Sequence, residues 1–452
     1  MGYAGVKSRV SGGVEEIRRR RRLNEARQVL LDTGFYHSFE FPDGTRIDGA
    51  ISLGYLNERL GSFPIPENLT GNSVLDIGPW DGFFTFAMER RGAAVTAIDY
   101  VDLDSFRLLA EQFGSRAKYL RMEVYELDPG RLGRFDYVLF LGVLYHLKHP
   151  QLAMERVCSV TKELCVVDTY VSNASQWLAG EGAAFPSMDL YEYDELAGQL
   201  DNWCGPTVEA VQMMARVAGF ASAEVLYVGE NTARVAAWRK WRNLPEDREA
   251  ALVLRGLASH WNGGRTFSSA KEEYVSLWCE WEGAVPELGE VWPEVDEFGV
   301  APLAVSVGED GLQVSFRLPP GLEAGRHTAR VKVGLRGWSE WGELFVDLGA
   351  MEGELRLVSL QDGVTWAAGE SGGWLTVWVD GLTAEADRGN TVVEIGGIPH
   401  EPVAVEAASG QVNVKLRPMV REGRWMVRVR HRGAVSGEME LGVSRGDGKV
   451  LQ

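Results

Sequence analysis

The chain has 452 residues, a length that favours two or three domains over one core. Its composition is that of a globular protein, and its formal net charge of −18 disfavours a partner with a phosphate backbone. Its four cysteines have neither metal-like nor disulfide-like spacing and no run of about 18 apolar residues occurs, so we expect a cytoplasmic protein without a membrane span or a metal site.

The chain begins with a charged, helix-like stretch that contains the arginine run Arg18–Arg22. Such a run can form a solvated helix face or contact nucleic acid. The acidic net charge makes nucleic acid the less favoured partner.

Up to about residue 241, strand-like and helix-like patterns alternate. Apolar stretches predict strands at residues 73–78, 94–99, 136–142, 163–170, 223–229 and 233–238. The alternation is typical of an α/β, Rossmann-like domain with a mostly parallel sheet covered on both faces. The last two stretches are separated by about three residues and predict a hairpin, so one strand should run antiparallel to the others. We place this domain at residues 1–245.

The remainder of the chain has a different pattern. Residues 246–268 are charged and helix-like, then loop-like, and predict a linker with one helix. Short alternating strands between glycine-rich turns then predict two all-β sandwich modules of the Ig-like type, at residues 269–350 and 351–452. The stretch from residue 390 to residue 416 resembles bacterial Ig-like repeats.

These β modules are rich in tryptophan. We expect some of the rings in the sandwich cores, and others on the surface, where they could stack on sugar rings or support a homodimer. The tryptophans are Trp278, Trp281, Trp292, Trp338, Trp341, Trp366, Trp374, Trp378 and Trp425.

The first predicted strand ends in a glycine-rich turn, with the pattern D-x-G-x-x-x-G from Asp76 to Gly82. Glycine lets the backbone approach a ligand closely, and the following helix N-terminus offers free N–H groups. Asp99 ends the next strand, where a carboxylate can accept both hydroxyls of a ribose. The dinucleotide fingerprint G-x-G-x-x-G is absent, so the turn suits S-adenosylmethionine better than a dinucleotide.

Four stretches carry a resemblance to a known family: GFYHSFEFPDG, VLDIGPWDGFFTFAMERRGA, FLGVLYHLKHP and DNWCGPTVEAVQMMARVAGF. Residues ~34–240 resemble the class I S-adenosylmethionine-dependent methyltransferases. More narrowly, they resemble the family that contains the tRNA wobble-uridine methoxy and carboxymethoxy synthases.

The resemblance implies a set of cofactor-binding residues. The turn would line the methionine part, and Asp99 and Tyr100 the ribose and adenine. The segment after a further strand in KYLRMEVYEL would border the adenine ring, and the end of the strand at residues 136–142 would lie under the sulfonium. The full set is Asp76, Gly78, Pro79, Trp80, Asp81, Gly82, Asp99, Tyr100, Glu123, Val124, Tyr125, Leu141 and Gly142.

The sequence departs from the carboxymethyl-transferring members of that family. Those members hold an extra cofactor carboxylate with an upstream Trp/Lys-rich stretch, a tyrosine and an arginine. Tyr145 matches the tyrosine, but the upstream stretch TRIDGAISLGYLNERL has neither lysine nor tryptophan. An unpaired carboxylate in a closed site is costly, so we expect the ordinary methyl donor.

A hydroxyl acceptor would need a base to remove its proton. His146 comes just after the strand predicted at residues 136–142, lies on the predicted rim and is the first candidate. His37, in a segment expected to cover the site, is the second. Tyr36, Tyr145 and Asp168 are further rim candidates.

An insertion at about residues 172–206 is rich in aromatic residues, among them Trp177 and Trp203. It could be a lid over an apolar or ring-shaped acceptor, or a packed insertion.

Three functions remain open from the sequence. The first is O- or N-methylation of a small molecule, a sugar or a lipid-linked acceptor. The second is methylation of a tRNA wobble uridine, as the resemblance implies. The third is a catalytically inert scaffold that binds glycans or partners; the intact set of Asp76, Gly78, Gly82 and Asp99 argues against it.

Overall fold

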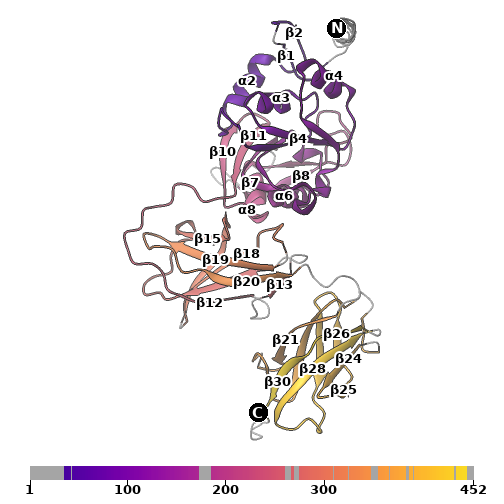
Figure 1. The fold of residues 1–452 in the computed structure, drawn as a ribbon, viewed down its shortest axis with the longest axis vertical. Coiled ribbons are helices and arrows are strands. Elements are labelled where there is room, and N and C mark those ends of the chain that lie inside the picture. Colours follow the sequence, from indigo (N-terminus) through magenta and orange to yellow (C-terminus); the bar gives the residue numbers. More distant parts are fainter. Residues whose placement is uncertain are drawn as a thin grey trace, which may run out of the picture. The chain divides into compact units, whose positions relative to one another are not determined.

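The computed structural model describes most of residues 35–444, which form two compact units (Figure 1). Within that range it leaves out residues 42, 173–184, 260–265, 269–273, 309, 324, 348–354, 366, 383–385, 390 and 432–433. The arginine run, Trp177, Trp366 and the predicted boundary between the β modules therefore lie outside the described residues. Unit 1 comprises Met1–Leu244, Glu297–Ala301 and Pro319–Gly321, and unit 2 comprises the rest.

Unit 1 is built on a seven-stranded sheet with the order β10-β11-β7-β6-β3-β4-β5. Its strands are β3 (Ser73–Ile77), β4 (Ala94–Asp99), β5 (Lys118–Arg121), β6 (Phe135–Leu141), β7 (Thr161–Tyr170), β10 (Ser222–Val228) and β11 (Thr232–Trp238). Adjacent strands in the run β7-β6-β3-β4-β5 are parallel. In contrast, β11 pairs antiparallel with both β7 and β10. The predicted mostly parallel sheet, with its terminal hairpin and one reversed strand, is confirmed.

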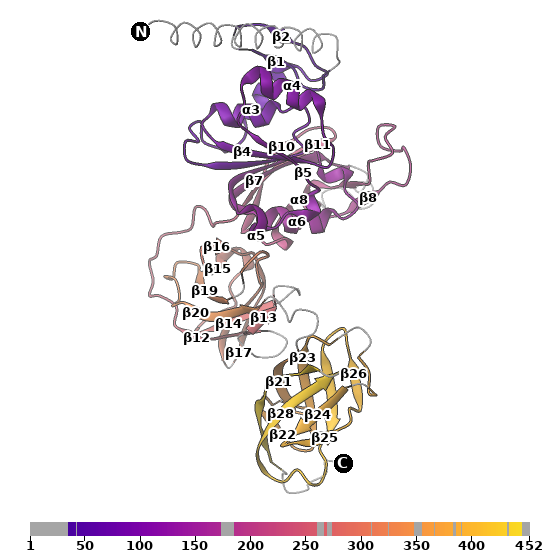
Figure 2. The ribbon, with the colours of Figure 1, turned by 45° about the vertical axis from the view of Figure 1, so that its right-hand side comes forward.

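Helices cover both faces of this sheet (Figure 2). One face carries α2 (Leu53–Gly61), α3 (Phe83–Arg90) and α4 (Asp104–Phe113), and the other carries α6 (Pro150–Ser159) and α8 (Val208–Val217). Each face has its own apolar cluster, because the strands present buried apolar side chains on both sides. Within the described part of the chain, no helix is long and apolar enough to cross a lipid bilayer.

Short elements lie near the ends of the sheet strands. They are β1 (Phe39–Glu40), β2 (Arg46–Ile47), η1 (Val124–Glu126), α5 (Pro129–Leu132), η2 (Leu144–His146), β8 (Met188–Leu190) and β9 (Cys204–Pro206). The β8–β9 hairpin belongs to the insertion that follows β7. Several of these elements contribute to the candidate site described below.

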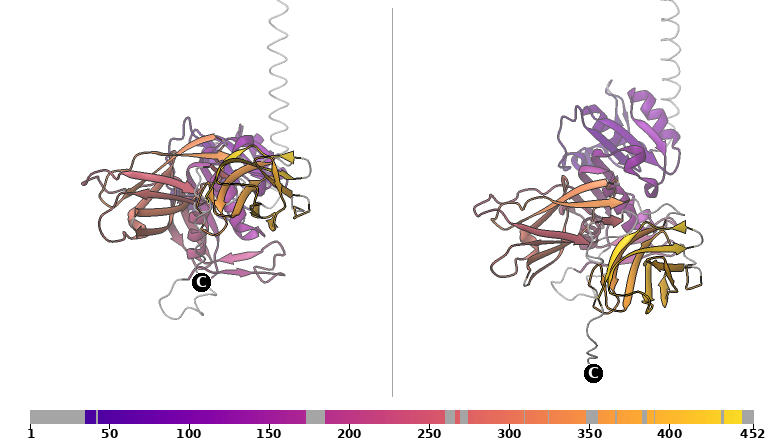
Figure 3. Two further views of the ribbon diagram at one scale, coloured as in Figure 1. Left: turned by 90° about the horizontal axis from the view of Figure 1, so that it is seen from below. Right: turned by 60° about the horizontal axis from the view of Figure 1, so that its bottom comes forward.

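Two sandwiches with the same strand order make up unit 2, except that the short strand β16 of the first belongs to unit 1. Figure 3 draws them in orange and yellow from two further directions. The first has sheets β12-β14-β18-β17 and β13-β20-β19-β15-β16, and the second has sheets β21-β23-β27-β26 and β22-β30-β28-β24-β25. Except for the parallel pairs β13–β20 and β22–β30, the pairings given for these sheets are antiparallel. The predicted all-β architecture is confirmed.

The bounds of the first sandwich are β12 (Leu254–Ser259), β13 (Thr266–Ser268), β14 (Tyr274–Cys279), η3 (Leu288–Glu290), β15 (Val291–Val295), β16 (Phe298–Gly299), β17 (Pro302–Gly308), β18 (Gly311–Arg317), β19 (Gly325–Val333) and β20 (Gly342–Asp347). Those of the second are β21 (Arg356–Asp362), β22 (Glu370–Ser371), β23 (Trp374–Asp380), β24 (Thr391–Ile395), β25 (Ile398–His400), β26 (Ala404–Glu406), β27 (Gln411–Lys415), β28 (Gly423–His431), β29 (Ala434–Val435) and β30 (Met439–Val443).

The expected linker helix within residues 246–268 is wrong. Residues 254–259 form β12, an edge strand that pairs antiparallel with β14. Leu257 is buried, so the strand contributes to the sandwich core. Pairing with a strand further along the chain therefore overrides the local helix-like composition.

Of the tryptophans that we expected in the sandwich cores, Trp425 is partly buried and packs against the core of the second sandwich. The described tryptophan side chains of unit 2 are all half-buried or exposed, while the buried core residues are smaller, such as Val314, Phe316 and Val412. The Trp338 and Trp341 rings lie 4.1 and 4.2 Å from the Arg330 guanidinium, one of several cation–π contacts in this unit. These rings thus pack against arginine side chains instead of filling the core.

Arg239, just after β11, is the largest fully buried side chain of the described residues. Its guanidinium donates to the carbonyl oxygens of Gly219, at 2.7 Å, and Thr161, at 3.3 Å. It also lies 4.1 Å from the ring centroid of Phe298, a residue of unit 1 that comes from the β-rich part of the chain. Unit 1 therefore includes side chains that lie well beyond residue 245.

We predict that Arg239→Met lowers the free energy of unfolding of unit 1 by about 2–4 kcal/mol, because two buried carbonyl groups lose their donor. The measurement is thermal unfolding of the full chain by calorimetry. Arg242→Met is the control: this exposed arginine stacks on Trp238 at 3.8 Å, and its loss should cost less than about 1 kcal/mol. Equal losses in both variants would show that the buried hydrogen bonds of Arg239 contribute little.

Candidate functional site

The predicted site residues gather at one edge of the unit 1 sheet. The parallel strands β3, β4, β6 and β7 all end at this edge, so the segments that follow them are neighbours. Side chains from the turn after β3, the end of β4 and the segment after β6 therefore surround one region.

The turn after β3 adopts a conformation that depends on two glycines. Gly78 and Gly82 have φ values of 68° and 89°, in the left-handed region. A Cβ atom on Gly78 would lie 2.5 Å from Cγ2 of Val143, and one on Gly82 would lie 2.8 Å from two phenylalanine rings. Between them, Trp80 also has a positive φ and its side chain is half exposed.

Asp81 has a structural partner that the sequence did not indicate. Its Oδ2 accepts hydrogen bonds from the backbone N–H groups of Tyr36, at 2.7 Å, and His37, at 3.1 Å. The carboxylate is buried. Asp81 therefore holds the segment before β1 against the glycine turn, so that Tyr36 and His37 lie beside it.

Asp76, within β3, is also buried. Its Oδ2 accepts a hydrogen bond from the Thr85 hydroxyl at 2.6 Å. Burial raises the pKa of the Asp76 carboxyl to about 7, and the nearby Asp99 charge adds to the rise. The site thus contains a carboxyl that a cationic ligand group would hold in its charged form.

Asp99 ends β4 and is buried, with its Oδ1 accepting from the Val101 N–H at 3.2 Å. Burial raises the pKa of this carboxyl. Among the described residues, only backbone N–H groups bond to the Asp99 carboxylate. Tyr100 beside it is 60% exposed, so its ring is available to a ligand.

The segment after β5 borders the same edge. Glu123 is exposed and begins η1, Val124 is buried, and Tyr125 is half-buried. The Tyr125 hydroxyl accepts a hydrogen bond from the His149 N–H at 3.1 Å. Tyr125 therefore also anchors the start of α6.

The end of β6 lies next to β7. Leu141 is opposite Asp168 in the parallel pairing, and the Gly142 N–H donates to the Asp168 carbonyl oxygen at 2.7 Å. Tyr145 follows in η2, and burial raises the pKa of its hydroxyl to about 12. That hydroxyl therefore stays protonated at neutral pH and can donate a hydrogen bond.

His146 has a partner from the insertion. Its Nδ1 lies 3.1 Å from the carbonyl oxygen of Asp201 and 3.6 Å from that residue's Oδ2. Both are acceptors, which assigns the ring hydrogen to Nδ1 and leaves the Nε2 lone pair free to accept a proton. Asp201 begins one of the four stretches that carry the family resemblance, but the sequence did not predict its contact with His146.

Asp168 is paired with two arginines. Arg59 of α2 contacts its carboxylate through Nη2 at 2.8 Å and Nε at 3.1 Å, and Arg234 of β11 donates through Nε at 2.9 Å. All three side chains are largely buried. With two guanidinium partners, Asp168 is suited to orient the neighbouring side chains. Sequence reasoning missed both arginines.

His37 is buried among aromatic rings, including those of Phe83 and Phe84. Burial and the nearby Arg59 charge lower the pKa of His37 to about 3. Its Nδ1 has no hydrogen-bond partner among the described residues. A histidine with this pKa is a weak base, which argues against His37 as the residue that deprotonates an acceptor.

The described part of the insertion contacts the rim directly. The backbone N–H of Trp203 donates to the Tyr145 carbonyl oxygen at 2.8 Å. The Lys148 ammonium lies 4.1 Å from the centroid of the Trp203 ring. Tyr191 approaches Tyr170 at the end of β7, with ring centroids 6.5 Å apart. Within the residues that the structure describes, no group of three His, Cys, Asp or Glu side chains could hold a metal ion.

Comparisons with known proteins agree with this arrangement. Residues 53–204 match the family model described as a methyltransferase domain. The chain is 28% identical over 192 residues to a tRNA U34 carboxymethyltransferase from Ectopseudomonas mendocina (strain ymp), covering 40% of this chain and 55% of that protein. It is 30% identical over 132 residues to a ubiquinone biosynthesis O-methyltransferase from Escherichia coli O7:K1, covering 28% of this chain and 52% of that protein. The chain thus spans about half the length of the curated relatives it matches.

A solved structure, the N-terminal domain of EvdMO1 with SAH bound, is also similar. The alignment covers 50% of this chain and 97% of that domain at 22% identity, with a TM-score of 0.38. Residues 53–204 of this chain thus match a methyltransferase domain family, and the sheet to which they contribute has a Rossmann-like strand order.

Proposed function

We propose that the chain is an S-adenosylmethionine-dependent methyltransferase that methylates a hydroxyl group of a small acceptor molecule. The observation that carries this proposal is the His146–Asp201 pair at the same sheet edge as the glycine turn and Asp99. The match of residues 53–204 to the methyltransferase domain family supports the reaction class.

The residues present fit S-adenosylmethionine. Gly78 and Gly82 let the turn after β3 pack closely where a Cβ would clash, and Asp99 offers a carboxylate that no described side chain occupies. A ribose hydroxyl pair is a suitable partner for that carboxylate. Asp76, with its raised pKa, would be stabilised in its charged form by the cationic amino group of the methionine part.

S-adenosylmethionine supplies a methyl group that its sulfonium has already activated. The chain's task is therefore to align the acceptor and to remove its proton. His146 Nε2 is the proposed base, because Nδ1 faces Asp201. Asp201 is the positioning residue that fixes the ring and stabilises the charge formed when the ring accepts the proton. Tyr145 can donate a hydrogen bond to the acceptor oxygen.

The ordinary methyl donor is proposed because the upstream stretch has neither the lysine nor the tryptophan that the carboxymethyl-transferring members use. The ion pairs of Asp168 do not separate the two donors, since Arg59 and Arg234 carry two positive charges against one carboxylate. The tRNA acceptor named for one relative therefore stays the second candidate, and the net charge of −18 disfavours it.

Other expectations from the sequence remain predictions. Homodimerisation through the β modules and a cytoplasmic location are among them. So is the choice between a sugar, a lipid-linked molecule and another small acceptor.

We predict that Asp99→Ala lowers the affinity for S-adenosylmethionine by at least about tenfold, because it removes a charged hydrogen-bond acceptor worth about 1.5–3 kcal/mol. Isothermal titration calorimetry measures the affinity, and thermal unfolding checks that the variant is folded. Asp102→Ala is the matched control, since Asp102 pairs with Arg107 at the surface. Unchanged affinity in a folded Asp99→Ala protein would refute the ribose assignment.

Tighter binding of the carboxylated donor than of S-adenosylmethionine by the wild type would overturn the donor assignment.

We predict that His146→Ala lowers kcat by roughly 10²–10⁴ without changing the affinity for S-adenosylmethionine. The assay uses an acceptor found by screening hydroxylated small molecules. Calorimetry with S-adenosylmethionine is the check on affinity, and a kcat near that of the wild type would assign the base to another group.

His37→Gln serves as the comparison. The pKa of His37, about 3, makes its ring a weak base, so this variant should keep kcat within about tenfold of the wild type. A fall in kcat of roughly a hundredfold or more in His37→Gln, together with a near wild-type kcat in His146→Ala, would assign the base to His37 instead.

A further inference from the structure

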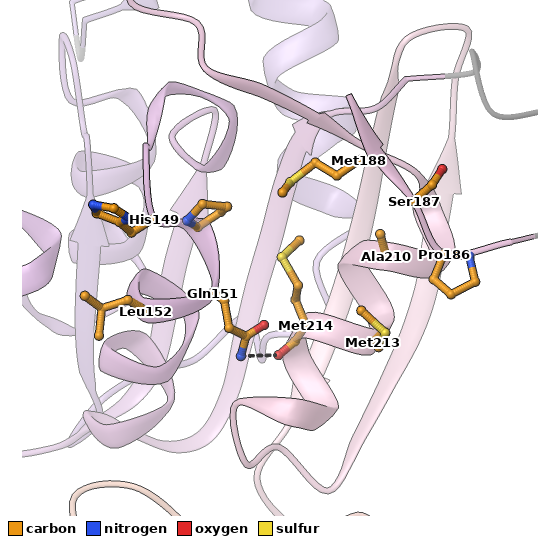
Figure 4. A pocket seen from close by; sticks show the side chains of 10 residues that line it. His149, Gln151, Leu152, Pro186, Ser187, Met188, Ala210, Met213 and Met214 are labelled. Atoms are coloured by element: carbon orange, nitrogen blue, oxygen red, sulfur yellow. Dashed lines mark hydrogen bonds between the residues drawn. The ribbon is translucent and has the colours of Figure 1, made fainter. Parts of the chain in front are cut away.

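An apolar groove opens on the α6–α8 side of unit 1 (Figure 4). The first residues of α6, the first turns of α8 and the strand β8 line it, and its volume is about 660 Å³. The side chains of Met188 and Met214 extend into the space between these elements. The groove is thus formed by three segments that are far apart in the sequence.

The lining is mostly apolar. Its polar side chains are those of His149, Gln151 and Ser187, and none of the lining residues is Asp, Glu, Lys or Arg. The amide nitrogen of Gln151 is already bonded to the Glu155 carboxylate at 3.2 Å and to the Met214 carbonyl oxygen at 3.5 Å. A charged ligand group would lose hydration here and would meet no Asp, Glu, Lys or Arg side chain in the lining, so the groove favours an uncharged occupant.

Apolar side chains at the groove remain exposed to solvent. Leu152, Met188 and Met213 are each about two-fifths exposed. Exposed apolar side chains that gather in a concave site often mark a place where a ligand binds. Methionine side chains also adapt their shape to irregular partners.

The groove shares its walls with the candidate active site. His149 lies in the groove wall three residues after His146, and its N–H donates to Tyr125 at the cofactor edge. The opposite wall, β8, pairs with β9, and Trp203 just before β9 donates its N–H to Tyr145. A molecule that reaches the site could therefore extend along the groove.

We propose that this groove binds an uncharged hydrocarbon group of the methyl acceptor. The inference rests on the proposed function and narrows its substrate class to acceptors that carry an apolar part beside the reactive hydroxyl. The volume lies within the range of about 300–1,000 Å³ that is typical of small-molecule sites. The segments that form the groove walls also contact the rim, which favours the acceptor itself over a second copy of the chain.

The first test uses a neutral apolar probe, N-phenyl-1-naphthylamine, whose fluorescence rises in apolar surroundings. The wild-type full chain should bind it with micromolar affinity, and Met213→Lys and Leu152→Lys should each weaken binding by roughly tenfold or more, since a lysine ammonium opposes an apolar occupant. Lysine is a good helix former, so both helices should persist. The matched control, Met419→Lys, adds the same charge at an exposed position of unit 2.

Two results of this test would overturn the proposal. One is no probe binding by the wild type, and the other is equal binding by the wild type and both groove variants. Sedimentation measured on the same samples adds a third, because a dimer that Met213→Lys dissociates would mean that a second copy covers the groove.

The second test links the groove to the acceptor. With an acceptor identified by screening, Met213→Lys should raise KM for the acceptor roughly tenfold and leave kcat and the affinity for S-adenosylmethionine nearly unchanged. An unchanged KM would overturn the assignment to the acceptor. Absence of S-adenosylmethionine binding in the wild type would instead contradict the proposed function, and the probe titration would still report on the groove separately.

Discussion

The candidate site depends on the buried ion pairs around Asp168. Arg234 lies directly opposite Asp168 in the pairing of β11 with β7, and Arg59 reaches the same carboxylate from α2. Removing the Asp168 carboxylate would take away the ion-pair partner of two largely buried guanidinium groups, and breaking a buried ion pair in this way typically costs about 3–5 kcal/mol. The ion pairs therefore tie the reversed strand and the first described helix to the strand end beside Leu141. The position of the segment carrying Tyr145 and His146 follows from that constraint.

A second set of contacts brings distant parts of the chain to this edge. Asp81 binds the backbone of the segment before β1, and Asp201 and Trp203 reach the rim from the insertion after β7. The glycine turn, the covering segment and the proposed base thus come from separate stretches of sequence. The same insertion forms one wall of the apolar groove, so it links the reacting centre to the surface where we place the rest of the acceptor.

The two sandwiches follow one plan with different surfaces. In the first, Arg330 pairs with Glu294 and lies between two tryptophan rings; in the second, Arg428 pairs with Glu394 at the equivalent strands β24 and β28. The shared ion pair joins the same two strands in each module. The aromatic rings that stack on Arg330 cover the outer face of the sheet, which explains why tryptophan-rich modules have cores of smaller side chains.

The sequence by itself determined the sheet strands, the reversed hairpin, the glycine turn with Asp76 and Asp99, and the β-rich nature of the second half. These features depend on local hydrophobic period, turn residues and a short spacing within one βαβ unit. Only the tertiary structure decided that Asp201 meets His146, that two arginines hold Asp168, that residues 254–259 form a strand, and that His37 is buried. Those outcomes depend on which distant segments pair and on how deeply a side chain is desolvated, and neither is encoded in the pattern of neighbouring residues.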